Sequence, residues 1–346
     1  MRLADAARVG ASLAAAKLTG AAVPFLVTIY PTMRCNLRCV YCSSPYERSS
    51  ELSVHEWRTA LEELASLGAH RIAILGGEPL MRADIGEIVA AVRTVGLKAA
   101  MTTNGTLVPR HRDVVERLHT LVVSVDGDRQ AHDRNRGEGS HADALAAIDL
   151  ARSWGVPVKI NAVLSADSTP SLPWLLAFAE RERLPLTLNL MRSEEVGLWH
   201  DAAAHRQSRD EIARLLDAIV EAKRRNPWVL FSTASYRVAA QWQDFTRDRL
   251  TAAEAGDTFP GPRCSAGRFF CSIHADGSLY PCSITMNQLP ALNVRTAGVA
   301  AALARARHHG CATCHTPCMV EQNALFALQP SVVASLARTY LRTRLE

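Results

Sequence analysis

Three cysteines within eight residues constrain this chain more than any other feature. Cys35, Cys39 and Cys42 are spaced C-x3-C-x2-C, and the apolar, β-branched run 24–30 before them predicts a buried strand. We therefore expect the thiols on a loop at the carboxyl end of a strand, where α/β folds place their chemistry. An odd number of thiols cannot all pair as disulfides. Three thiolates can hold an iron–sulfur cluster through three irons and leave the fourth iron open.

The loop resembles the signature of the radical S-adenosylmethionine (radical SAM) enzymes, which has this spacing and an aromatic residue before the last cysteine, here Tyr41. The resemblance implies a [4Fe–4S] cluster on Cys35, Cys39 and Cys42, whose open iron binds the amino and carboxylate groups of SAM. One electron from the cluster then cleaves a carbon–sulfur bond and gives a 5′-deoxyadenosyl radical. A zinc loop is the alternative, but zinc takes four ligands, and no histidine or fourth cysteine follows at short range.

Composition narrows the class of protein further. The chain has 346 residues, of which 48% are hydrophobic, and a net charge of +5. The length predicts one large domain with a smaller one, and the mild charge gives no reason to expect nucleic acid as a partner. The nine cysteines fall into two distant groups without an export signal. This pattern favours metal binding in a reducing cytoplasm over disulfides.

Strands and helices alternate after the cysteine loop. Ser53 and Glu56 form a capping-box motif that predicts the start of a helix. Further strands are predicted at 71–75, 98–102, 121–125, 158–163 and 185–190, with helices between them. Such an alternation predicts parallel pairing through right-handed crossovers. The resemblance implies that these six units form the partial (β/α)6 barrel, a TIM-like α/β fold, of the radical SAM family.

A glycine pair follows the second predicted strand. Two glycines in this place let the backbone approach a ligand closely. The segment Gly76-Gly77-Glu78-Pro79 matches the GGEP motif of the family. The resemblance implies that Gly76, Gly77 and Glu78 line the edge that binds the amino group of SAM, since carbonyls and a carboxylate accept hydrogen bonds from an ammonium.

Polar residues also follow the fourth and fifth predicted strands. Ser124 and Arg136 resemble the residues that hold the SAM carboxylate in family members with an SxDG…HDxxRG pattern. A guanidinium binds a carboxylate strongly and directionally. The alternative is that Arg136 pairs with Asp133 on the surface. Asn161, on the fifth strand, is expected at the edge of the nucleoside.

A second cysteine group lies far downstream. A hairpin is predicted with its turn at Asp276-Gly277, and cysteines lie around and after it: Cys264, Cys271, Cys282, Cys311, Cys314 and Cys318. The group resembles the SPASM/twitch extension found after the barrel in some radical SAM enzymes, including its DGxxxPC pattern. The twitch arrangement implies one auxiliary [4Fe–4S] cluster on Cys264, Cys282, Cys311 and Cys314, with Cys271 and Cys318 as substitutes or free thiols. A zinc knuckle is the alternative.

These elements predict an ordered series of parts. The N-terminal segment is alanine-rich and interrupted by charges, so it predicts a helix packed against the barrel rather than a secretory signal or a membrane span. The C-terminal segment predicts a basic amphipathic helix. Both helices could instead contact a membrane surface. The expected boundaries are an N-terminal helix (1–23), the radical SAM partial barrel (24–190), a helical connector that completes the barrel (191–263), the SPASM/twitch domain (264–320) and the C-terminal helix (321–346).

The resemblance implies an enzyme that abstracts a hydrogen atom from its substrate, with a flavodoxin- or ferredoxin-like electron donor. No residue selects the reaction, which can be an oxidation, an epimerisation or a bond formation. Few residues precede Cys35, so we expect a small metabolite or natural-product intermediate rather than a peptide bound by a built-in leader-recognition domain. The alternatives are a peptide maturase with a separate recognition protein, a lipid-modifying enzyme, and a non-catalytic iron–sulfur carrier or zinc protein.

Overall fold

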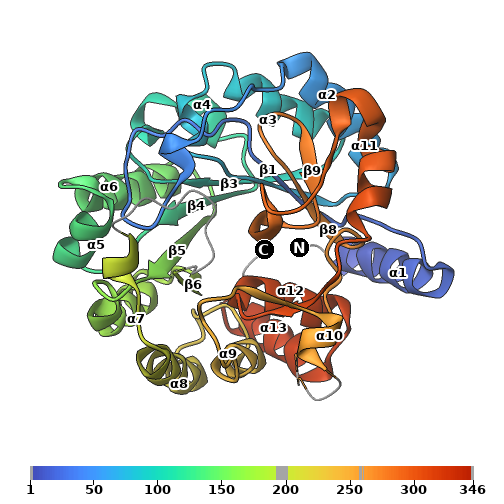
Figure 1. Cartoon of the computed structure of the whole chain (residues 1–346). Helices are drawn as coiled ribbons and strands as arrows, with labels where there is room; N and C mark the ends of the chain where they lie inside the picture. Colours follow the sequence, from blue (N-terminus) through green and yellow to red (C-terminus); the bar gives the residue numbers. More distant parts are fainter. Residues whose placement is uncertain (1–2, 192–201, 257–258, 260, 344–346) are drawn as a thin grey trace.

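The computed structural model describes residues 3–191, 202–256, 259 and 261–343. Its main sheet has nine strands in the order β10-β9-β8-β1-β2-β3-β4-β5-β6. The strands curve around the middle of the molecule with helices outside them (Figure 1). The six predicted strands are present and parallel, as β1 (Leu26–Ile29), β2 (Arg71–Ile74), β3 (Lys98–Thr103), β4 (Thr120–Ser124), β5 (Val158–Leu164) and β6 (Leu186–Leu190). The predicted α/β partial barrel is confirmed.

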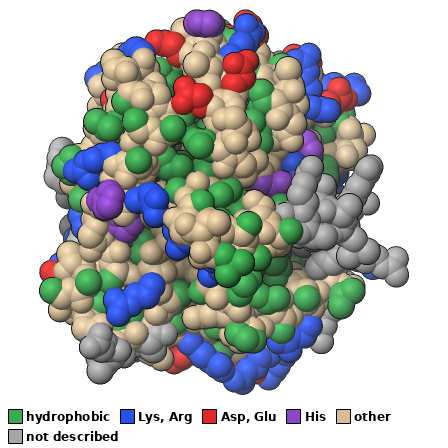
Figure 2. All heavy atoms as spheres, turned by 90° about the vertical axis from the view of Figure 1, so that its right-hand side faces the viewer, with side chains coloured by type: hydrophobic (Ala, Val, Ile, Leu, Met, Phe, Trp, Pro, Cys, Tyr) green, Lys and Arg blue, Asp and Glu red, His purple; other side chains and the backbone are tan. Residues whose placement is uncertain are grey.

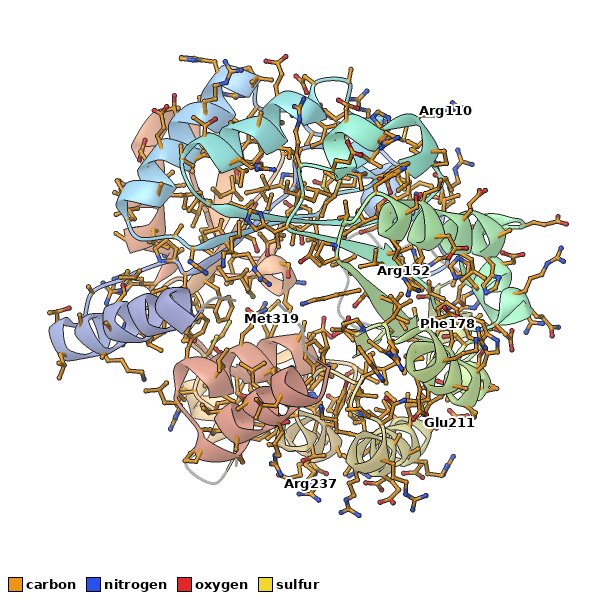
Figure 3. All side chains as sticks on the ribbon, turned by 180° about the vertical axis from the view of Figure 1, so that it is seen from behind. Arg110, Arg152, Phe178, Glu211, Arg237 and Met319 are labelled. Carbon is orange, nitrogen blue, oxygen red and sulfur yellow. The ribbon has the colours of Figure 1, made fainter. Side chains whose placement is uncertain are left out.

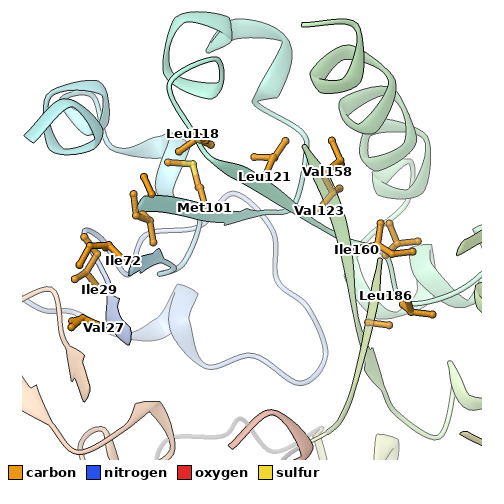
Figure 4. Packing of buried hydrophobic residues seen from close by; sticks show 14 of the residues in the cluster. Val27, Ile29, Ile72, Met101, Leu118, Leu121, Val123, Val158, Ile160 and Leu186 are labelled. Carbon is orange, nitrogen blue, oxygen red and sulfur yellow. The ribbon is translucent and has the colours of Figure 1, made fainter. Parts of the chain in front are cut away.

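Helices cover the outer face of the sheet, and the core lies between them. Residues alternate between the two faces of a strand, and Val27, Ile29 and Ile72 point outward into this core (Figure 4). Arg110 and Arg237 lie at the periphery of the molecule (Figure 3). The covering helices are α2 (Val54–Ser66), α3 (Ile85–Thr94), α4 (Arg112–Val115), α5 (Arg129–Arg136), α6 (Ser140–Ser153) and α7 (Leu172–Glu182).

The cysteine-rich extension shares the sheet of the barrel. Strand β8 (Phe270–Ile273) pairs in parallel with β1, and β9 (Ser278–Tyr280) and β10 (Leu292–Asn293) continue antiparallel. The predicted hairpin is therefore present, but the sequence did not predict that it would join the barrel. The pairing satisfies the open edge of β1 and places the carboxyl end of β8 at the same edge as the cysteine loop.

The remaining elements close the ring between β6 and β8. Figure 1 shows α8, α9, α12 and α13 on this side of the molecule. Strand β7 (Arg249–Thr251) pairs antiparallel with β11 (Cys311–Cys314) in a separate two-stranded sheet. The helices are α8 (Arg209–Arg225), α9 (Thr233–Ala240), α10 (Ala252–Ala255), α11 (Val294–Ala306), α12 (Pro317–Phe326) and α13 (Pro330–Thr343).

The N-terminal helix α1 (Leu3–Thr19) packs both on the extension and on Phe25 and Leu26 at the start of the barrel. Leu13 and Ala16 lie in one apolar cluster with Phe269 and Phe326. The guanidinium of Arg268 donates to the carbonyls of Ala16 and Ala21 at 3.0 and 3.2 Å. Figure 2, which faces this side, shows hydrophobic side chains among Lys and Arg side chains. Of the helices within the described residues, none has both the length and the hydropathy to cross a membrane.

Candidate functional site

The three-cysteine loop begins after β1 and presents three thiols that are not joined in disulfides. Cys39 is buried, while Cys35 and Cys42 are half-buried. The amide of Cys42 donates to the carbonyl of Cys39 at 3.0 Å, which turns the loop back on itself. Burial raises the pKa of Cys35 to about 11 and that of Cys39 to about 12. Thiolates at these positions need a compensating positive charge, which a bound metal centre supplies.

The glycine pair holds this loop in place. The amide of Gly77 donates to the carbonyl of Thr32 at 2.9 Å, and the amide of Glu78 donates to that of Arg34 at 2.8 Å. A Cβ atom on Gly77 would lie 2.2 Å from the carbonyl oxygen of Arg34, and one on Gly76 would lie 2.3 Å from that of Thr32. The close approach predicted for these glycines is therefore to the protein's own backbone, directly before Cys35.

The side chain of Glu78 links the ends of β2 and β3. Its Oε1 accepts from the hydroxyl of Thr103 at 2.9 Å and the amide of Leu80 at 3.2 Å, and its Oε2 accepts from the amide of Asn104 at 2.8 Å. The carboxyl is fully buried, and burial raises its pKa. The structure thus gives Glu78 three protein donors, which its predicted role toward the SAM amino group did not anticipate.

A buried carboxylate that sequence reasoning missed organises the other side of the site. Asp126 accepts two hydrogen bonds from the guanidinium of Arg136, at 2.8 and 3.1 Å, and one from the hydroxyl of Tyr41 at 2.6 Å. The amide of Val163 adds a fourth at 3.0 Å. Burial opposes the charge, but Arg136 outweighs it and lowers the pKa of Asp126. This network ties the cysteine loop to β4, β5 and α5.

Arg136 is thus buried and paired with Asp126, and not with Asp133 on the surface, as the alternative interpretation held. Asp133 instead accepts from the amide of His141 at 2.8 Å. The signal for the Asp126 pair was in the sequence, because Asp126 is the acidic residue of the SxDG pattern that was quoted for Ser124.

Ser124 and Asn161 are neighbours in the sheet. They are register partners, Ser124 at the end of β4 and Asn161 in the middle of β5, on the face opposite the apolar pair Val123 and Ile160 (Figure 4). Ser124 is buried, and the Oδ1 of Asn161 accepts from Thr187 and Asn189 on β6, both at 2.8 Å. The structure therefore brings these two predicted residues together on the inner face of the barrel.

Four of the downstream cysteines line one cavity. They are Cys264, Cys282, Cys311 and Cys314. Cys264 is held beside β11 by its amide, which donates to the carbonyl of Ala312 at 2.7 Å. Burial raises the pKa of Cys264 to about 12, and burial also raises that of Cys314, with the neighbouring thiols adding to both shifts. These are the four residues that the twitch arrangement implied.

The remaining two downstream cysteines lie differently. Cys271 is on β8, where its neighbour Phe270 lines the cavity. Adjacent residues of a strand point to opposite faces, and Cys271 belongs to the core between sheet and helices. Cys318, at the start of α12, is close enough to Cys314 to affect its charge.

Both donor sets fit iron–sulfur clusters chemically, because thiolates are the ligands of such clusters. Within the described residues, no three His, Cys, Asp or Glu side chains meet around a point that could hold a single metal ion. Cluster thiolates each bind a different iron and need no common point.

Comparisons with known proteins agree with this geometry. Residues 29–170 match the model of the radical SAM superfamily. The Fe-coproporphyrin III synthase of Methanosarcina barkeri is 33% identical over 163 residues, which cover 44% of this chain and 40% of that protein. A PqqA peptide cyclase of Xanthomonas oryzae pv. oryzae is 32% identical over 224 residues, covering 60% and 58% of the two chains. The chain thus spans about half the length of such curated relatives.

A solved structure of a known protein has a similar fold. The structure of Streptococcus suis SuiB bound to S-adenosylmethionine has a TM-score of 0.61 and 19% identity, and the match covers 81% of this chain and 66% of SuiB. This likeness concerns the fold. Radical SAM enzymes use a [4Fe–4S] cluster and SAM, and the cysteine loop described above carries the family's donor set. Residues 29–170 therefore form a radical SAM domain, and a cysteine-rich extension follows this domain in the chain.

Proposed function

We propose that this chain is an enzyme that cleaves SAM reductively and uses the resulting radical to abstract a hydrogen atom from a substrate. The observation that carries the proposal is the set of three cysteines on the loop after β1, held against the glycine pair and tied to the Asp126–Arg136 network. A [4Fe–4S] cluster on Cys35, Cys39 and Cys42 would supply the electron and the open iron.

The chain's own residues would then orient SAM. The guanidinium of Arg136 uses Nε and Nη2 for Asp126, and its Nη1 has no partner among the described residues. Since a guanidinium carries five N–H donors, Arg136 keeps donors for the SAM carboxylate beside Ser124. The backbone of Gly76 and Gly77 would face the amino group, and Asn161 the nucleoside. The buried network holds Tyr41 and Arg136 in position before any ligand binds.

The four cysteines of the downstream cavity would hold one auxiliary [4Fe–4S] cluster. Their burial and their common cavity support the set Cys264, Cys282, Cys311 and Cys314. Iron counting on the reconstituted protein tests this part. About eight irons for each chain support the second cluster, and about four contradict it.

For the substrate we propose a small metabolite or natural-product intermediate, with an external flavodoxin- or ferredoxin-like protein as the electron donor. A peptide is the second candidate. One relative is a PqqA peptide cyclase, and a structure of SuiB has been solved with its precursor peptide SuiA bound. Transfer of deuterium from a labelled candidate into 5′-deoxyadenosine distinguishes the two.

The activity itself is tested by anaerobic reconstitution with iron and sulfide, followed by reduction with dithionite in the presence of SAM. We expect 5′-deoxyadenosine from the natural chain and none from Cys39→Ala. Cys271→Ala is the matched control, since this thiol lies in the core and not on the loop. A reduced cluster that leaves SAM intact, with candidate substrates present, would contradict the proposal and favour an electron carrier.

A further inference from the structure

A cleft of about 180 Å³ lies between the cysteine loop and the loop that follows Cys282. Its walls include Tyr41 and Cys42 on one side and Met286 and Asn287 on the other. This volume suits a small ligand or one group of a larger ligand, since sites for drug-sized ligands have about 300–1,000 Å³. None of the residues proposed for SAM except Tyr41 lines this cleft, so a second molecule can lie there beside SAM.

Glu47 is the single Lys, Arg, Asp or Glu among the described residues that line the cleft. Its Oε1 forms an ion pair with the Nε2 of His274 at 2.7 Å and accepts a hydrogen bond from the side-chain amide of Asn287 at 3.3 Å. Its Oε2 has no hydrogen-bond or ion-pair partner within the described part of the chain. A fixed carboxylate with one uncommitted oxygen is a good acceptor for a ligand's donor group.

His274 follows β8 and faces the barrel interior, where its ring stacks on Tyr30 with the ring centroids 6.5 Å apart. Its Nδ1 lies 3.2 Å from Asp276, so the imidazole is held between two carboxylates. Burial favours the neutral ring, but the neighbouring carboxylates of Asp276 and Glu47 outweigh it and raise the pKa of His274 to about 9. The imidazolium is therefore the form at neutral pH.

The charges decide which donor group fits. Two carboxylates and one imidazolium leave this trio with a net negative charge, and no Lys or Arg among the described residues lines the cleft. A cationic ligand gains from this field. A neutral hydroxyl gains only the hydrogen bond.

We propose that this cleft is the substrate site and that it binds a protonated amine of the substrate through the free oxygen of Glu47. The proposal rests on the function proposed above, since it places the substrate beside the cysteine loop. Asn287 and His274 position the carboxylate, and Glu47 contacts the ligand.

Calorimetric titration of the anaerobically reconstituted, SAM-loaded enzyme tests the site with two probes of equal size, butylammonium and 1-butanol. We expect saturable binding of butylammonium to one site, and binding of 1-butanol weaker by at least about tenfold. Glu47→Gln keeps the shape but removes the charge, and it should weaken butylammonium binding by about tenfold or more. Glu116→Gln, in an exposed ion pair with Arg112 on α4, is the matched control and should change nothing.

A second variant keeps the proposal testable if Glu47→Gln fails to fold. Met286→Lys places a cation on the cleft wall, where it should occupy Glu47 and block butylammonium. Equal binding of the two probes, unchanged binding by Glu47→Gln and Met286→Lys, or no saturation up to about 50 mM would overturn the proposal. Measuring 5′-deoxyadenosine on the same samples separates the two proposals, because SAM cleavage without amine binding refutes the site alone.

Discussion

The two cysteine groups of this protein are built in opposite ways. The first lies within eight residues of one loop, from Cys35 to Cys42. Backbone hydrogen bonds to the glycine pair hold it, and the buried Asp126 network supports it. The second is assembled from separate segments around a cavity with an apolar wall, which includes Phe270 and Met319. The first site depends on local geometry, whereas the second depends on the pairing of β8 with β1 and of β7 with β11.

The comparison teaches which site tolerates substitution. A loop pressed backbone to backbone against its neighbour has no room for a methyl group, whereas thiols brought together by strand pairing are held by many contacts at once. Iron content should therefore distinguish a variant that loses the cluster on the loop from a variant that loses the auxiliary cluster.

The largest effect is expected from Gly77→Ala. The added Cβ would meet the carbonyl oxygens of Arg34 and Met33 at 2.2 and 2.4 Å, so the cysteine loop must move. We expect iron to fall from about eight to about four per chain, with the auxiliary cluster kept. Formation of 5′-deoxyadenosine should fall by at least about 100-fold, since the cluster that cleaves SAM is lost and even a shift of about 1 Å in a catalytic group costs that much.

The control is Gly10→Ala on α1, where an added Cβ has no neighbour within 4 Å. Iron analysis and the electron paramagnetic resonance spectrum of the reduced protein measure the outcome. Retention of both clusters and of activity in Gly77→Ala would show that the loop adapts, and the contrast between the two sites would then be wrong.

This contrast also explains how much the sequence could reveal. The spacing of the first cysteines and the alternation of strands and helices are local patterns, so they predicted the barrel and the loop. Strand pairing between distant segments has no local pattern, and the parallel pairing of β8 with β1 was therefore missed. The position of Cys271 on the core face could therefore be assigned only after that pairing was known.

The partners of charged residues were predicted less well, for the same reason. The role of Arg136 toward SAM stays a prediction, but the alternative partner Asp133 was wrong, because the fold pairs Arg136 with Asp126. Glu47 carries no motif, and its ion pair with His274 joins segments far apart in the chain. Only the sheet order brings these two residues together, so sequence reasoning passed over the cleft between them.

The second prediction concerns this ion pair, which connects the two regions. The pKa of His274 is raised from 6.5 to about 9 in the folded protein, against burial, by Asp276 and Glu47. A raised folded pKa contributes stability that is complete below pH 6.5 and is lost as pH rises through about 9. We expect the free energy of unfolding to fall by about 3 kcal/mol over this interval. Urea denaturation of the protein at a series of pH values measures it.

His274→Gln is the comparison for that experiment. This variant has no imidazolium. Its free energy of unfolding should therefore fall less between pH 6.5 and 9 than that of the natural chain. If both proteins lose stability in parallel with pH, the ion pair does not hold the two regions together.

The smallest effect is expected from Cys271→Ala. This thiol lies on the core face of β8, whereas Phe270 beside it lines the cavity of the downstream cysteines. Its removal leaves a small cavity in the core and should cost about 1 kcal/mol of unfolding free energy. Iron should stay near eight per chain, and Cys311→Ala, the contrasting variant, should bring it toward four. Loss of iron in Cys271→Ala would mean that β8 turns this residue toward the cluster, and the second site would then be a different set of thiols from the one that the fold brings together.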